Sequence, residues 1–155
     1  MKKFLERQVA FDVTLKFLAF LAKRSFFDGL TYLLTKRSAQ LNFTLNKPKH
    51  ANEVKQLAET WQKLMPPDGQ QYFRIKEIDD KTAITEIHLH CPLRGTGRVD
   101  ACYKLMNYDR QLMEMVDGQL IVLESQSNSG KNYCRLAIRK KGEEVSDLTP
   151  AHLPK

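Results

Sequence analysis

The stretch Leu120–Lys140, LIVLESQSNSGKNYCRLAIRK, contains two segments in which apolar and polar residues alternate, one on each side of Asn128-Ser129-Gly130. A period of two residues is typical of a strand with one buried face, and Asn, Ser and Gly favour a turn. The stretch therefore predicts an antiparallel hairpin with strands over residues 120–126 and 132–140.

The position of the turn also predicts which side chains face each other. A turn centred on Ser129 places Val122 opposite Leu136 and Glu124 opposite Cys134. Because the apolar face of the hairpin must be the buried one, we expect Glu124 and Cys134 on the core side of the sheet. A carboxylate in that position needs a polar partner.

Outward from the hairpin, the chain divides into further helices and strands. The predicted helices cover residues 2–24, a segment that begins at Ser25, residues 51–65 and residues 99–116, and the other two strands cover residues 72–78 and 82–91. This order predicts an α+β fold, with an antiparallel sheet of about four strands, helices packed on one face and an N-terminal helical segment. We expect residues 1–141 to form a single domain and residues 142–155 to form a loose C-terminal tail.

The composition of the chain indicates one globular domain of ordinary size. It has 155 residues, of which 42% are hydrophobic and 28% charged. The longest uninterrupted apolar run, Phe17–Ala22, is too short for a signal peptide or a transmembrane segment, so we expect neither. Three cysteines cannot all pair within one chain, which favours a cytoplasmic protein over a secreted disulfide framework.

Two more cysteines are expected near the hairpin. Alternation along the preceding strand places Cys91 on its apolar face and His88 and His90 on the other face, and Cys102 lies on the helix that should cover the sheet. The residues expected to converge between sheet and helix are Cys91, Cys102, Glu124 and Cys134.

Such a group of thiols and a carboxylate has three interpretations. The cysteines can be buried core residues with Glu124 satisfied by an arginine or by backbone. They can form a zinc site with Cys102, Cys134 and Glu124 or Cys91 as ligands, since zinc favours sulfur together with nitrogen or oxygen. One thiol can be a nucleophile assisted by the carboxylate, although no histidine base is predicted on the same face.

Several of these residues resemble a known family. His90-Cys91-Pro92, then Cys102, then Gly130-Lys131-Asn132-Tyr133-Cys134 ahead of an Ala-Ile-Arg strand resemble the L-2-amino-thiazoline-4-carboxylic acid hydrolase family and the related 4-vinyl-reductase-type small-ligand-binding domains. The resemblance covers about a third of the chain, from Ile87 to Arg139.

The resemblance implies a pocket lined by the three thiols. In the hydrolase family, Cys91, Cys102 and Cys134 would be the pocket thiols and one of them the nucleophile. In the zinc-binding sensor relatives, Cys102 and Cys134 would be ligands together with a Glu and a further Cys, but Gln126 stands where that Cys is expected. The Cys-Tyr pair on the helix makes Tyr103 a candidate ligand contact.

Two arginines are candidates for holding an anionic group. Arg94 and Arg98 lie just before the helix predicted to begin near Val99. A helix N-terminus with two guanidinium groups is a natural anchor for a carboxylate.

We therefore expect a small-molecule-binding domain, with a cysteine-dependent hydrolase of a small carboxylate-bearing substrate as the concrete candidate. The alternative is a non-catalytic ligand or zinc sensor on the same scaffold. The net charge of +7 also permits a nucleic-acid-binding protein, but the basic residues are dispersed and no recognition motif is present. The wide apolar faces of the first two helices predict a homodimer.

Overall fold

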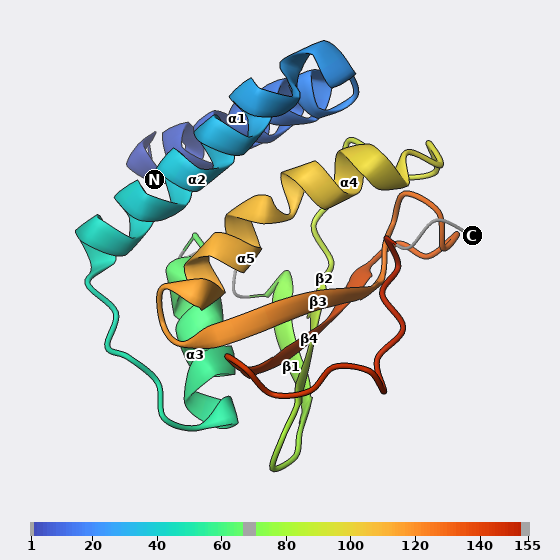
Figure 1. Ribbon diagram of the computed structural model, residues 1–155. Helices are drawn as coiled ribbons and strands as arrows, with labels where there is room; N and C mark the ends of the chain where they lie inside the picture. The colour runs from blue at the N-terminus through green and yellow to red at the C-terminus, as the bar shows by residue number, and fades with distance from the viewer. Residues whose placement is uncertain (1, 67–70, 153–155) are drawn as a thin grey trace.

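The computed structural model describes residues 2–66 and 71–152 and confirms the α+β fold (Figure 1). The helices are α1 (Lys2–Ala22), α2 (Asp28–Asn46), α3 (Val54–Leu64), α4 (Val99–Leu105) and α5 (Asn107–Glu114), and the 3-10 helix η1 (Ser25–Phe27) joins α1 to α2. The strands are β1 (Phe73–Ile78), β2 (Ala83–Ile87), β3 (Gly118–Glu124) and β4 (Cys134–Lys140). They form one antiparallel sheet in the order β1-β2-β4-β3.

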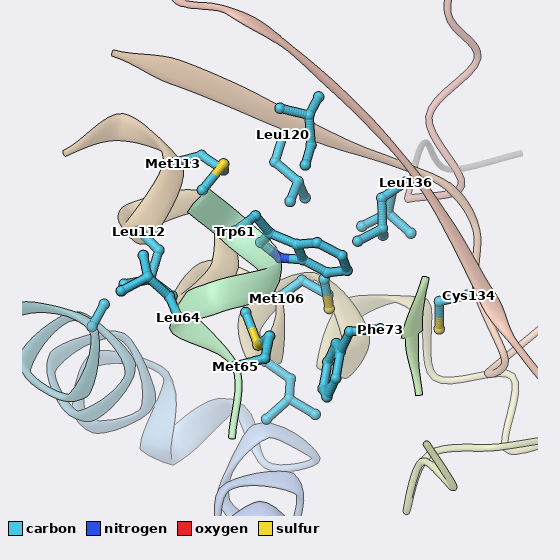
Figure 2. Packing of buried hydrophobic residues seen from close by; sticks show 14 of the residues in the cluster. Trp61, Leu64, Met65, Phe73, Met106, Leu112, Met113, Leu120, Cys134 and Leu136 are labelled. Atoms are coloured by element: carbon cyan, nitrogen blue, oxygen red, sulfur yellow. The ribbon is translucent and has the colours of Figure 1, made fainter. Parts of the chain in front are cut away.

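The main core lies between the sheet and helices α3 and α5. Val122 pairs with Leu136 as the hairpin predicts, and both side chains are buried. Trp61 of α3 is fully buried in the middle of this core, with its ring edge-to-face against Phe73 at a centroid separation of 5.7 Å (Figure 2). Aromatic pairs of this geometry add stabilisation beyond that of area burial.

Helices α1 and α2 lie side by side and form an outer layer against α4 and α5 (Figure 1). The face of α2 that meets α5 carries the small residues Thr31, Thr35 and Ala39, all fully buried, so the two helices approach closely. The Thr35 hydroxyl donates to the Thr31 carbonyl oxygen and accepts a hydrogen bond from Asn107 Nδ2 at 2.9 Å. No helix within the described ranges is both long and apolar enough to cross a membrane.

The region predicted as one helix over residues 99–116 contains two. Helix α4 ends and α5 begins at Met106, whose ψ angle of −1° changes the direction of the chain. Neither proline nor glycine stands at this position, so the apolar pattern does not reveal the break. Because of it, α4 contacts α1 while α5 contacts both α2 and β3.

The segment after β4, predicted as a loose tail, contacts the body of the domain as far as residue 152. The two terminal nitrogens of the Arg139 guanidinium, Nη1 and Nη2, donate to the carboxylate of Asp147 at 2.6 Å. The amide of Ala151 donates to the carbonyl oxygen of Val122 at 2.7 Å. Since Val122 lies on the edge strand β3, the segment covers a strand edge that is otherwise open to other chains.

Candidate functional site

A cavity of about 620 Å³ lies between the α1–α2 layer and the rest of the domain. Its wall is mostly apolar, with Leu15 and Leu18 from α1 and with Phe73, Leu105 and Met106 from the body. Its position follows from the fold: α1 and α2 contact α4 and α5, and the cavity lies where the two helices face the end of α3 and the segment after β2. The cavity is of the size and apolar character of a small-molecule site.

One polar group of the wall is a pair between α2 and α5. Asn42 Nδ2 donates to the Tyr108 hydroxyl at 2.5 Å and to the carbonyl oxygen of Leu64 at 2.8 Å. Burial raises the pKa of Tyr108 to about 12, so its hydroxyl stays protonated at neutral pH. The pair presents a neutral hydrogen-bonding group to the cavity.

A second polar group is the carboxyl of Asp109 on α5. Its Oδ1 accepts a hydrogen bond from the indole Nε1 of Trp61 at 2.9 Å. Burial raises the pKa of Asp109 to about 6, while the indole and the positive charge of Arg110 lower it. Burial is the largest of these effects, so the carboxyl titrates much closer to neutrality than an exposed aspartate.

Gln126, which is only 1% exposed, lies in the cavity wall and connects the segment after β3 to the segment after β2. Its Nε2 donates to the carbonyl oxygen of Leu89 at 2.8 Å, and its Oε1 accepts from Arg94 Nε at 2.7 Å and from the Cys91 amide at 3.4 Å. The side chain thereby fixes the segment after β2, which the sequence predicted as a continuing strand and which leaves the sheet after Ile87. In this segment His90, predicted to face outward, lines the cavity.

Two of the three cysteines lie at the cavity. Cys91 and Cys134 line it, whereas Cys102 does not. Burial raises the pKa of all three thiols, to about 12 for Cys102 and about 11 for Cys134. Cys91 contributes to both of these shifts, so the three thiols lie within electrostatic reach of one another. All three are protonated at neutral pH and therefore poor nucleophiles.

Cys102 has a histidine neighbour that sequence reasoning missed. His152 Nε2 lies 3.2 Å from Cys102 Sγ, and Ser125 Oγ lies 3.0 Å from the same sulfur. Burial lowers the pKa of His152 to about 4, so the imidazole is neutral at pH 7. A neutral imidazole beside a protonated thiol is not the ion pair of an activated cysteine.

The prediction that Glu124 shares the core face with Cys134 is wrong. The register of β3 and β4 shifts between Val122 and Glu124, so that Glu124 pairs with Arg135 instead. Its carboxylate lies on the outer face of the sheet, 2.5 Å from Lys131 Nζ. The cause is an irregularity of one residue, and such a shift moves a side chain to the opposite face.

The proposed zinc ligands are not brought together either. Glu124 lies on the outer face, and of the alternative set Cys91, Cys102 and Cys134, only Cys91 and Cys134 share the cavity wall. Within residues 2–66 and 71–152, no group of three or more His, Cys, Asp or Glu side chains is arranged to hold a metal ion. These residues do not fit a structural zinc site, which takes four ligands.

The predicted ligand contacts outside the cysteines also lie elsewhere. Arg94 is bonded to Gln126 and to the carbonyl oxygen of Asn132, and Arg98 to Asp100 and to the carbonyl oxygen of Lys23 at 2.7 Å. Tyr103 is 45% exposed and stacks against the guanidinium of Arg110. None of the three predicted residues is part of the described cavity wall.

Comparisons with known proteins add no evidence on function. No family model, no curated protein and no solved structure matches this chain. The resemblance to the thiazoline-carboxylate hydrolases and the 4-vinyl-reductase-type domains stays a prediction, and the geometry of the cavity carries the functional argument.

Proposed function

We propose that this protein binds an apolar small molecule in the cavity between the α1–α2 layer and the body of the domain. The observation that carries the proposal is the cavity itself, with a volume of about 620 Å³ and an apolar wall interrupted by a few polar groups. Ligand sites of known proteins have this composition and a volume of roughly 300–1,000 Å³. The polar groups include Asn42 with Tyr108, Asp109, Gln126 and His90.

A binding module is favoured over an enzyme by the state of the thiols. The two cysteines at the cavity have raised pKa values, and within the described part of the chain no base or cation is bonded to either. A cysteine hydrolase remains the second candidate, because Cys91 is half-buried at the cavity wall, where a substrate could reach it.

A cytoplasmic location is part of the proposal, because all three cysteines are free thiols.

A nucleic-acid partner has less support than the sequence allowed. Two basic residues on the outer face of the sheet are paired within the protein, Arg135 with Glu86 at 2.9 Å and Arg139 with Asp147 at 2.6 Å. Guanidinium groups held in this way are not free to bind phosphates.

The proposal is tested with N-phenyl-1-naphthylamine, a neutral apolar fluorophore, and with tryptophan substitutions on α2. Ser38 lines the cavity, whereas Thr44 is exposed on the same helix and does not. We expect the wild type and Thr44→Trp to bind the fluorophore with equal affinity, and Ser38→Trp to bind it about fivefold or more weakly, because the indole occupies the cavity. No binding to the wild type, or equal binding to both variants, contradicts the proposal.

We also propose a homodimer through the outer faces of α1 and α2. The large apolar side chains exposed there are Val9, Val13, Phe17 and Phe20 on α1 and Leu30 and Leu33 on α2. On α1 they form one stripe at helical spacing, opposite the buried face that carries Leu18 and Ala22. A helix that is apolar on opposite faces is normally buried on both, and a second copy offers the same stripe.

A further inference from the structure

The carboxyl of Asp109 has capacity for a further partner. The residue lines the cavity and is only 8% exposed. Among the described residues, the indole of Trp61 is the only side chain that donates a hydrogen bond to it. The backbone amide of Asp109 itself also donates to the carboxylate. A carboxylate offers about four acceptor positions on its two oxygens, so capacity for a further donor remains.

The cationic side chains near Asp109 are directed to other groups. Arg110, the next residue on α5, donates to the carbonyl oxygen of Tyr103 and stacks on the Tyr103 ring at 4.0 Å. Lys63 and His90 belong to the cavity wall, but both are exposed residues, and neither forms an ion pair with Asp109. Within the described part of the chain, no cation contacts this buried carboxyl directly.

We propose that Asp109 recognises the ligand and that the ligand is an apolar molecule with a protonated amine. This inference rests on the proposed function and specifies its ligand class. The apolar wall accepts the hydrocarbon part, and the ammonium group supplies further hydrogen-bond donors and an opposite charge in direct contact with the carboxylate. The assignment reverses the charge of the ligand that the sequence predicted, because neither Arg94 nor Arg98 lines the cavity.

The ionisation of Asp109 makes this recognition depend on pH. With its pKa raised to about 6 by burial, the carboxyl is mostly charged at pH 7.5 and mostly neutral at pH 5. Of the ionisable groups that face it, Tyr108 on α5 and Cys134 on β4 stay neutral over this range, while Arg110 stays positive. Lys63 and His90 of the cavity wall are not bonded to it. An alkylamine is charged throughout, so its affinity should follow the ionisation of Asp109.

The test compares n-octylamine with 1-octanol, which has the same chain and no charge, by isothermal titration calorimetry at pH 7.5. Asp109→Asn removes the charge but keeps an oxygen that can accept from Trp61. We expect this variant to bind n-octylamine about tenfold or more weakly than the wild type, and 1-octanol within about twofold. The matched control Asp12→Asn changes an exposed carboxylate on α1 and should leave both affinities unchanged.

The outcomes separate this inference from the proposed function. Binding of both probes with no loss of amine affinity in Asp109→Asn overturns the role of Asp109 and leaves the cavity as an apolar binding site. Binding of neither probe to the wild type overturns both. If Asp109→Asn does not fold, the pH dependence of binding to the wild type tests the inference. The inference requires n-octylamine to bind about tenfold more tightly at pH 7.5 than at pH 5, while the affinity for 1-octanol is unchanged. An amine affinity that is equal at both pH values refutes it.

Discussion

Asp109 links the pH dependence of stability to the candidate site. Its pKa is about 6 in the folded protein, above the 3.8 of an exposed aspartate, so between pH 4 and 6 the folded state holds more protons than the unfolded state. Stability from this group therefore falls as pH rises through this range. The free energy of unfolding of Asp109→Asn, taken relative to that of the wild type, should therefore increase by on the order of 2–3 kcal/mol from pH 4 to pH 7.5. Urea unfolding at the two pH values measures this.

His152 has the opposite effect on the pH dependence of stability, but this effect cancels when the variant is compared with the wild type. Its pKa of about 4 lies below the 6.5 of an exposed histidine, so its effect lowers stability as pH falls from 6.5 to 4, equally in the wild type and the variant. A stability difference between Asp109→Asn and the wild type that is the same at both pH values would show that the carboxyl is not buried as described.

The three thiols should differ in reactivity according to their access. At pH 7.5 we expect iodoacetamide to modify Cys91 first and Cys102 and Cys134 far more slowly, because the last two are 3% and 5% exposed and have pKa values of about 12 and 11. Mass spectrometry of a time course measures this, with the urea-unfolded protein as the control. A thiol that reacts faster in the folded protein than in the unfolded one would favour the hydrolase candidate.

Individual residues show how far the sequence could predict the site. Apolar alternation predicts that Val122 and Leu136 are cross-strand neighbours, and the structure confirms this pairing. Two residues further along, the shift in register places Glu124 on the outer face, and nothing in the alternation indicates it. The polar groups of the cavity were missed because Asn42, Tyr108 and Asp109 lie on helices whose mutual packing depends on tertiary structure.

At the scale of elements, the start of β3 depends on a glycine. A Cβ at Gly118 would lie 2.9 Å from Leu57 Cδ2 and 3.3 Å from the carbonyl oxygen of Met113. We expect Gly118→Ala to lower the free energy of unfolding by about 1–3 kcal/mol, because α3 and α5 must move to make room. Thermal unfolding checks this against Gly29→Ala, where a Cβ has nothing within 4 Å and alanine favours the helix. Equal stability of the two variants would contradict the packing of α3 and α5 against β3.

The elements themselves were largely predictable, but their arrangement was not. All four strands lie within or close to their predicted ranges, since period-two alternation depends only on local sequence. The break at Met106 and the contacts of the C-terminal segment depend on partners far away in the chain. The cavity between α1, α2 and the body has no local signature for the same reason.

At the scale of the whole molecule, the exposed faces of α1 and α2 decide the oligomeric state. We expect light scattering at micromolar concentration to give twice the 18.0 kDa mass of one chain. Phe17, 53% exposed in the middle of the α1 stripe, is the position to change. Phe17→Glu should give a monomer, because a charge in that face cannot be buried without a partner. Ile78→Glu, at an apolar side chain that is 41% exposed at the end of β1 and away from both helices, serves as the control, and a monomeric wild type refutes the dimer.

The central claim is that a small molecule enters the cavity, and the methionine methyl groups report on it directly. Met65 and Met106 line the cavity, whereas Met113 is buried in the core and Met115 is only partly buried, and neither lines it. In methyl-labelled wild-type protein titrated with 1-octanol, we expect the NMR signals of Met65 and Met106 to shift and saturate while those of Met113 and Met115 stay in place. Unchanged signals from Met65 and Met106, or equal shifts of all four methyl groups, would contradict a ligand site in this cavity.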